Sequence, residues 1–268
     1  MFYKFKSIPL FIFLLVISAF SIAETQSNET LIEFQFATDP WPPFFLETTS
    51  KQISEGIGYE LVVELFKTIP NAKPTFPKLP WKRALLEVET GAKDAIALLL
   101  KTDERAQYME FTKPLMQTPA LIFFNKKSFP DGFSWGDVSE FNQYKIGVVR
   151  GYSYGEPFDT YIASKPKNVH EVTSSTQLFS MLQRQRIDLV PENSAVAYTL
   201  AADQGWLENL GASEKVLSSD ILHIGISKKS KHLSLLAELN RAIDALYKSG
   251  KIDRLVGQLG SSVKPELN

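Results

Sequence analysis

An arginine in an unfavourable helical position is the first sign of chemistry in this chain. Arg105 ends the run Thr102-Asp103-Glu104-Arg105, which follows the apolar segment 95–100. Thr102 suits a helix N-cap, and the two acidic residues after it suit the positive end of the helix macrodipole. A cation in the first turn opposes that dipole. Arg105 is therefore either an ordinary solvated surface residue or a residue held there to bind an anionic ligand.

Aromatic residues at loop positions form a second candidate group. Trp41, Phe44 and Phe45 lie around prolines after the first predicted strand, and Tyr152 and Tyr154 lie in the turn after the segment 145–149. Aromatic faces at strand ends suit a ligand with an apolar or cationic part. Packing within the loops explains each of them equally well. Trp81 begins an apolar helix face, so we expect it to pack in the core.

The turn Gly151-Tyr152-Ser153-Tyr154-Gly155 fits two kinds of site. It matches the G-x-S-x-G nucleophile elbow of serine hydrolases, with Asp188 and His223 downstream in the required order. No Gly-rich oxyanion loop precedes it, however, and the two tyrosines would crowd the sharp elbow. We favour the alternative, in which exposed backbone amides of residues 151–154, at a helix N-terminus, bind a ligand anion.

Glu192 and Asn193 form a third candidate, because they follow the predicted strand 187–190. Polar residues at the carboxyl ends of strands face the ligand cleft of an open α/β sheet. Asn193 could instead cap the helix that begins at Ser194.

The pattern of apolar residues predicts an α/β protein. Strands are predicted at 31–38, 95–100, 120–124, 145–149, 169–172, 187–190 and 221–226, with helices between them, among them 80–91, 175–185 and 194–204. The continuous apolar character of 95–100, with helices on either side, favours a mostly parallel sheet covered on both faces.

The polar stretch 125–135 separates two α/β series of similar organisation. The last amphipathic segment is too isolated to form a domain, so we expect it to pack back on the first series. The predicted domains are a discontinuous lobe 1, residues 24–124 plus 223–268, and an inserted lobe 2, residues 125–222. The chain would cross between them twice, near Asn125 and His223.

The N-terminal residues indicate export. Lys4 and Lys6 precede an apolar run, residues 8–20, and small residues end at Ala23. We expect a signal peptide, residues 1–23, cleaved after Ala23, which places the mature chain in the bacterial periplasm. A retained N-terminal anchor is the alternative.

Composition limits the partners. The chain has no cysteine, which excludes disulfides and lipid attachment through cysteine. Its 29 basic and 30 acidic residues balance, and no basic tract occurs, so we expect no nucleic acid partner. The three histidines are too widely spaced for a helical or hairpin metal site, and we expect no metal and no cofactor.

Several short motifs follow one another along the mature chain. They are Asp39-Pro40-Trp41-Pro42-Pro43-Phe44, Gly58-Tyr59-Glu60-Leu61, Gly91 with Asp94, Thr102-Asp103-Glu104-Arg105, Phe111-Thr112-Lys113-Pro114, Ile146-Gly147-Val148 with Gly151, and Arg186-Ile187-Asp188 before Asn193. In this order and spacing, the chain resembles the bacterial extracellular solute-binding proteins of the polar amino acid type over almost its entire mature length.

The resemblance implies a two-lobe, type II-like periplasmic-binding-protein fold, each lobe a mostly parallel sheet flanked by helices, which closes about two hinge strands. It implies a monomeric binding protein rather than an enzyme. The protein would present a small carboxylate-bearing solute, an amino acid or a related compound, to an inner-membrane ABC permease.

By position, the resemblance implies that Arg105 clamps the ligand α-carboxylate, that Trp41 and Phe44 form an aromatic wall, and that the Gly151 turn gives a second anion contact. The full set of candidate ligand-binding residues is Arg105, Thr102, Trp41, Phe44, Gly151, Tyr152, Ser153, Glu192 and Asn193.

The chain departs from the family pattern at the amine end of the ligand. Asn193 stands where an acidic residue usually meets the ligand ammonium, so either Glu192 supplies the charge or the ligand has no α-ammonium. Two other functions are kept as alternatives. One is a periplasmic dehydratase-like enzyme with Glu192 as general acid, and the other is a ligand sensor not coupled to transport.

Overall fold

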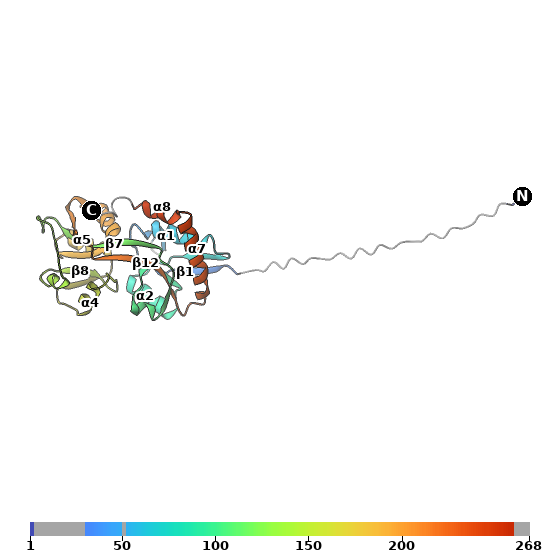
Figure 1. Ribbon diagram of the computed structural model, residues 1–268, viewed down its shortest axis with the longest axis horizontal. Helices are drawn as coiled ribbons and strands as arrows, with labels where there is room; N and C mark the ends of the chain where they lie inside the picture. Colours follow the sequence, from blue (N-terminus) through green and yellow to red (C-terminus); the bar gives the residue numbers. More distant parts are fainter. Residues whose placement is uncertain (3–29, 50–51, 260–268) are drawn as a thin grey trace. The chain divides into compact units, whose positions relative to one another are not determined.

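The computed structural model describes residues 1–2, 30–49 and 52–259 of the chain (Figure 1). Most of the predicted signal peptide lies outside these residues, so its cleavage after Ala23 stays a prediction. From Leu31 onward the chain forms one compact unit by its internal contacts. Within the described part of the chain, no helix combines the length and the apolar character that crossing a membrane requires.

Two long, adjacent strands run through the main sheet of eight strands (Figure 1). The order is β5 (Ala95–Leu100), β12 (Ser218–Ser227), β7 (Met116–Asn125), β10 (Leu189–Asn193), β8 (Ile146–Val149) and β9 (Val169–Val172), with β6 (Met109–Phe111) paired to β12 and β11 (Leu210–Ala212) paired to β7. Asn125 ends β7 and His223 lies within β12, the places where the chain was expected to cross between lobes. The lobe boundaries themselves remain a prediction.

The strand directions are mixed, so the expectation of mostly parallel sheets holds only in part. Parallel pairs are β10 with β8, β8 with β9, and β1 (Ile32–Gln35) with β4 (Ala72–Thr75). Strands β7 and β12 run antiparallel to every neighbour described. A continuous apolar strand indicates burial on both faces, which antiparallel neighbours allow as well when helices cover the sheet. A hairpin of β2 (Leu46–Thr49) and β3 (Gln52–Glu55) lies apart from this sheet.

The helices bury apolar stripes against the strands. The α-helices are α1 (Ile57–Phe66), α2 (Trp81–Thr90), α3 (Asp103–Ala106), α4 (Phe158–Ala163), α5 (Ser175–Gln183), α6 (Ser194–Asp203), α7 (Leu236–Lys248) and α8 (Lys251–Gly257). Helix α7 buries Leu239 and Ile243 fully and packs against α1 and α8 (Figure 1). The final amphipathic segment thus packs on an early helix, as its apolar stripe predicted.

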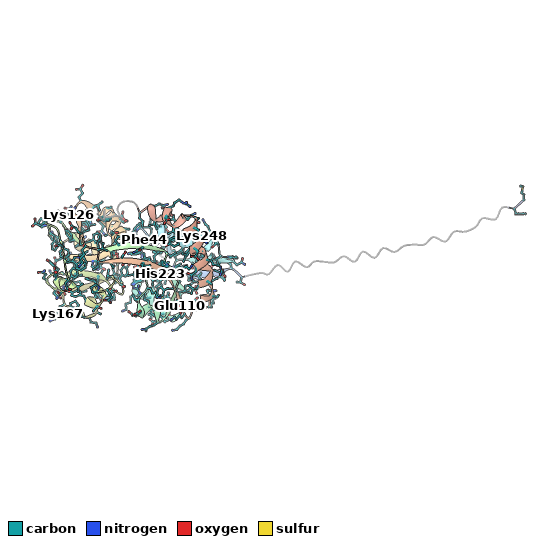
Figure 2. The ribbon with its side chains drawn as sticks, in the orientation of Figure 1. Phe44, Glu110, Lys126, Lys167, His223 and Lys248 are labelled. Atoms are coloured by element: carbon teal, nitrogen blue, oxygen red, sulfur yellow. The ribbon has the colours of Figure 1, made fainter. Side chains whose placement is uncertain are left out.

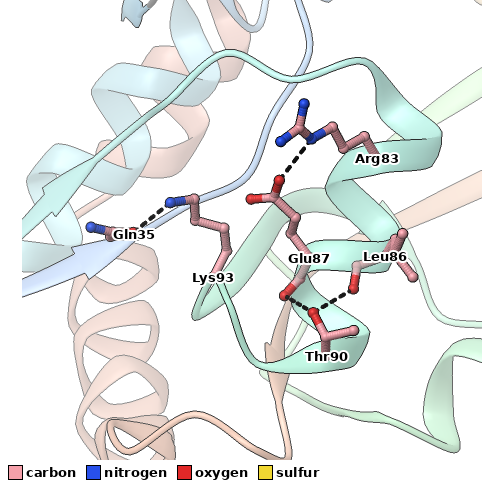
Figure 3. A network of polar contacts seen from close by, with 6 residues as sticks. All are labelled: Gln35, Arg83, Leu86, Glu87, Thr90 and Lys93. Carbon is pink, nitrogen blue, oxygen red and sulfur yellow. Dashed lines mark hydrogen bonds and ion pairs between the residues drawn. The ribbon is translucent and has the colours of Figure 1, made fainter.

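Helix α2 shows how a buried face and a solvated face share one helix. Trp81 and Ala84 face inward. On the outer face, Arg83 Nε donates to Glu87 Oε1 at 2.8 Å, and Thr90 Oγ1 donates to the carbonyl oxygens of Leu86 and Glu87 (Figure 3). Trp81 and Ala84 belong to one buried cluster with Ile96 and Leu99 of β5, so the inner face of α2 lies against the sheet.

Candidate ligand-binding site

Arg105 lies in the interior rather than on the surface. The side-chain oxygen of Thr102 accepts a hydrogen bond from the Arg105 backbone N–H at 3.2 Å, which confirms Thr102 as the N-cap of α3. The Arg105 side chain then turns inward and is only 5% exposed. The alternative of a solvated surface arginine is therefore wrong.

The Arg105 guanidinium contacts backbone carbonyls and one aromatic ring. Its Nη1 donates to the Leu100 carbonyl at 2.8 Å, and its Nη2 donates to the Gly151 carbonyl at 3.2 Å. Its central carbon lies 5.5 Å from the centre of the Trp81 ring. The ion pairs found among residues 30–49 and 52–259 all involve other side chains. Burial lowers the pKa of Arg105, but an arginine stays charged in proteins. It is thus a buried cation that can accept an anionic partner.

The Gly151 turn meets Arg105 through a carbonyl group and not through its amides. Gly151 has φ +82°, a left-handed conformation that glycine adopts without strain. Its carbonyl oxygen also accepts from Trp81 Nε1 at 2.8 Å. The Tyr152 amide donates to the Val149 carbonyl, and the Tyr154 amide donates to Asp159 Oδ1 at 2.8 Å. In this conformation those two amides have partners within the chain, and α4 begins only at Phe158.

The hydrolase interpretation of the same turn lacks its catalytic geometry. The Ser153 hydroxyl donates to Asp159. Asp188 instead accepts from the Lys145 amide, and His223 Nδ1 contacts the Thr112 carbonyl. The hydrogen bonds of Asp188 and His223 thus go to other partners than Ser153.

A small cavity lies beside Arg105. Its volume is about 50 Å³, and it is lined by Thr38, Asp39, Trp41, Phe45, Trp81, the segment from Ala97 to Leu100, Arg105, Tyr152, Ser153, Asp220 and Leu222. A water molecule needs roughly 10–15 Å³ by such a measure, so this space holds a few waters. A solute the size of an amino acid fits only when the lining groups move apart.

The aromatic wall differs from the predicted one in two residues. Phe44 is fully buried and packs behind Trp41, with 4.6 Å between the ring centres. Phe44 is among the residues labelled in Figure 2, and Phe45 rather than Phe44 lines the cavity. Trp81, expected only in the core, is buried and also lines the cavity, where its ring meets that of Tyr152 edge to face at 5.3 Å.

A bulge in β5 shapes one side of the cavity. Leu99 pairs with His223 and Ala97 pairs with Ile224, which leaves Leu98 as an extra residue. Leu98 has φ +56°, a left-handed conformation that is uncommon for leucine. Bulges redirect side chains and are frequent next to functional sites. Here the bulge turns a stretch of an apolar strand into cavity lining.

Two buried carboxyl groups line the cavity, and neither was among the predicted site residues. Asp39 is 5% exposed, and Tyr152 donates its hydroxyl to Asp39 Oδ2 at 2.8 Å. Asp220 accepts from the Ser218 hydroxyl. Burial raises the pKa of Asp39 to about 7 and that of Asp220 to about 6. In the sequence, Asp39 was only part of a family motif, and Asp220 preceded a predicted strand without any other sign.

Glu192 lies behind the aromatic wall. It is 2% exposed and accepts hydrogen bonds from the Ser175 hydroxyl, from the Asn193 amide at 2.8 Å, and from Trp41 Nε1 at 3.4 Å. Burial raises its pKa to about 7. Glu192 therefore touches the cavity wall through Trp41 but does not line the cavity.

Asn193 has a structural role in this fold. Its Oδ1 accepts from the Ala195 amide at 3.0 Å, so it caps α6 as the capping alternative predicted. Its Nδ2 donates to the Thr118 hydroxyl on β7. Both ends of the side chain are used, and Asn193 does not line the cavity. Of the nine predicted site residues, Arg105, Trp41, Tyr152 and Ser153 do line it.

Solved structures of three kinds resemble this chain. One is the substrate-binding protein of an amino acid ABC transporter, 18% identical, covering 85% of this chain and 98% of that chain with a TM-score of 0.68. Another is an arginine-, lysine-, histidine-binding protein from Geobacillus stearothermophilus, 17% identical, covering 87% and 97% with a TM-score of 0.69. A histidine kinase sensor domain is 15% identical, covering 88% and 98% with a TM-score of 0.73.

At these identities the structures establish the fold, which is that of the periplasmic binding proteins. No curated protein sequence matches the chain. The family model for bacterial extracellular solute-binding proteins, family 3, matches residues 34–260, which is most of the chain and includes every lining residue of the cavity. The chain belongs to the bacterial extracellular solute-binding proteins of family 3.

Proposed function

We propose that this protein binds a small carboxylate-bearing solute, an amino acid or a related compound, in the periplasm and presents it to an inner-membrane ABC permease. One observation carries the proposal. Arg105 is a buried cation without a carboxylate partner in the described part of the chain, and it borders a cavity with aromatic walls. A solute carboxylate would give it the charged partner that the chain does not provide.

The contacts of Arg105 suggest how the solute enters. Its guanidinium now donates to the carbonyl oxygens of Leu100 and Gly151. Arginine has five N–H donors in a planar fork, so it can bind a carboxylate through two parallel hydrogen bonds. The cavity is too small for the solute as it stands, so binding requires separation of the lining groups and closure around the ligand. We propose that this movement is a hinge motion of two lobes.

Binding rather than catalysis is the function that the contacts favour. A general acid must reach the substrate atom that it protonates. Both oxygens of Glu192 accept hydrogen bonds from the chain, and Trp41 lies between Glu192 and the cavity. We therefore assign Glu192 the task of holding Trp41 and not that of a catalyst. A sensing role would use the same binding step with a different membrane partner.

A calorimetric screen tests the proposed function. The purified protein is titrated with amino acids, amines, sugars and organic acids, and each binding solute is then titrated into Arg105→Lys. Lysine lacks the planar fork, so we expect a loss of roughly tenfold or more for a carboxylate-bearing solute. Arg83→Lys is the matched control, because Arg83 lies on the outer face of α2.

Binding of sugars alone, or equal affinity in the wild type and Arg105→Lys, would contradict the proposal. Circular dichroism spectra establish that each variant is folded. Fractionation of cells that express the full chain tests the compartment, since a periplasmic protein is released by osmotic shock.

A further inference from the structure

A groove beside Trp81, separate from the cavity at Arg105, is lined by basic residues. Its volume is about 340 Å³, which lies within the range of roughly 300–1,000 Å³ that small-molecule sites occupy. Lys82, Arg83 and Arg150 line it, and no acidic residue is among the described residues of its walls. The groove therefore presents positive charge without a carboxyl group in its lining.

Two separate parts of the fold supply these cations. Lys82 and Arg83 lie in the first turn of α2, whereas Arg150 directly follows β8. A cation in the first turn of a helix opposes the macrodipole, and α2 has no acidic residue in that turn to offset it. The conflict that singled out Arg105 thus occurs again here, with two cations instead of one.

The basic side chains keep hydrogen-bond donors for a ligand. Lys82 is exposed, and it forms no ion pair in the described part of the chain. Arg83 pairs with Glu87 at 2.8 Å (Figure 3), and Arg150 pairs with Glu171 at 2.9 Å. Both arginines use Nε for these bonds, so their terminal nitrogens have no acceptor among the described residues. Exposed ion pairs of this kind contribute little to stability, so a ligand can share or displace them.

The lining fits a phosphate monoester better than a carboxylate. A phosphate monoester carries a charge of about −1.5 to −2 at neutral pH and has three strong acceptor oxygens. Arginine binds such a group through two parallel hydrogen bonds, and lysine binds it as a point charge. Leu86, which is 55% exposed, lines the same groove and offers an apolar surface to an organic group. Thr173 adds a hydroxyl group from the end of β9.

We propose that this groove binds a small phosphate monoester, with Lys82, Arg83 and Arg150 around the phosphate and Leu86 against the organic group. Trp81 lines both this groove and the cavity at Arg105, so the two sites are neighbours. The bound ester bridges α2 and Arg150, next to the hydrogen bond from Trp81 Nε1 to the Gly151 carbonyl. This inference goes beyond the proposed function and needs no other solute.

Calorimetry with phenyl phosphate in a phosphate-free buffer tests the proposal. Phthalate is the matched comparison, because it is also an aromatic anion with two acidic groups but carries carboxylates. The titrations are made at low ionic strength, where exposed charges are least screened. We expect wild-type protein to bind phenyl phosphate roughly tenfold more tightly than phthalate, or more.

Substitutions locate the bound phosphate. Lys82→Gln and Arg150→Gln should each weaken the binding of phenyl phosphate by roughly fivefold or more. Lys167→Gln, which removes an exposed cation outside the groove, should leave its Kd unchanged. The replaced side chains are all exposed, and circular dichroism spectra establish that each variant is folded.

Four results would overturn the inference while leaving the proposed function untouched. Phenyl phosphate might fail to bind, or phthalate might bind as tightly. The Kd of phenyl phosphate might be the same in the wild type and both groove variants, which includes the case in which only Arg105→Lys weakens it and the probe occupies the cavity. Finally, sedimentation with phosphatidylglycerol vesicles without binding of phenyl phosphate would assign these cations to a lipid surface.

Discussion

Replacing Asp39 by asparagine should change how the stability of the protein depends on pH. The carboxyl group of Asp39 is buried, and its pKa is raised from 3.8 to about 7, chiefly by desolvation. A raised carboxyl pKa means that the unfolded chain loses this proton at a lower pH than the folded chain. Ionisation of Asp39 therefore destabilises the fold as pH rises from the unfolded pKa to the folded pKa, and the full penalty remains above the folded value.

The shift in the Asp39 pKa sets the size of the effect. A pKa raised from 3.8 to about 7 corresponds to roughly 4 kcal/mol once both states are ionised. Part of this penalty is already present at mildly acidic pH, so between about pH 5 and about pH 8 the wild type should lose roughly 2–3 kcal/mol through this one group. Asparagine keeps an oxygen that can accept the Tyr152 hydroxyl. It has no charge to bury, so Asp39→Asn avoids the loss.

Urea unfolding at several pH values measures this effect directly. Glu192 and Asp220, whose pKa values are also raised, titrate in both proteins, so the difference between the wild type and Asp39→Asn isolates the one group. We expect Asp39→Asn to gain stability relative to the wild type as pH rises. Asp131→Asn, at an exposed position, should follow the wild type. Parallel curves for the wild type and Asp39→Asn would refute the assignment of a buried, desolvated carboxyl group.

Three further substitutions test the site and its support. Arg105→Ala should lower the free energy of unfolding by about 0.5–1.5 kcal/mol, because the Leu100 carbonyl loses its side-chain donor while the Gly151 carbonyl keeps that of Trp81 Nε1. It should weaken ligand binding by about 2–5 kcal/mol, and an unchanged Kd would remove Arg105 from the site. Asn193→Ala should cost about 1–2 kcal/mol in thermal or urea unfolding through the lost helix cap, and a Kd for the bound solute different from that of the wild type would contradict a purely structural role. Gly58→Ala places a methyl group 2.6 Å from Leu98 Cδ1, so urea unfolding should show a loss of about 1–3 kcal/mol in the free energy of unfolding. If the variant is as stable as the wild type, the Leu98 side chain moves aside at little cost.

The regular elements could be predicted wherever apolar residues repeat with a clear period. Helix α2 and strand β5 begin and end within one residue of the predicted bounds, since Pro80 and Gly91 mark the helix and the apolar run 95–100 is the strand. The long strands were predicted too short. Most of the extra residues are polar, and some of them pair with one another, as Asp220 pairs with Thr118 across β12 and β7. Pairing between residues so distant in the sequence leaves no local pattern.

Site residues could likewise be predicted only where they left a local pattern in the sequence. Arg105 was identified because its charge conflicts with the local helix dipole, a conflict that is visible in four residues. Asp220 gave no such signal, because its importance depends on the strand that carries it and on the cavity beside it. The sequence did not decide whether Glu192 and Asn193 bind the ligand or support the fold. The predicted strand ended before them, whereas strand β10 continues through both residues. Their side chains then bond within the fold, to Ser175 and Thr118.

The present contacts of Arg105 bear on the strength of the proposed binding. Leaving a guanidinium buried and unpaired would be costly, and the carbonyls of Leu100 and Gly151 reduce that cost before any ligand arrives. These carbonyls use two of its five N–H donors, so a ligand carboxylate either binds the remaining donors or displaces a carbonyl. In the second case only the difference between a contact with a carboxylate and one with a neutral carbonyl contributes to affinity. Affinity and stability are thereby linked through the same guanidinium. An arginine substitution should be judged by unfolding and by calorimetry together, because either measurement alone mixes the loss of the ligand contact with the loss of the internal one.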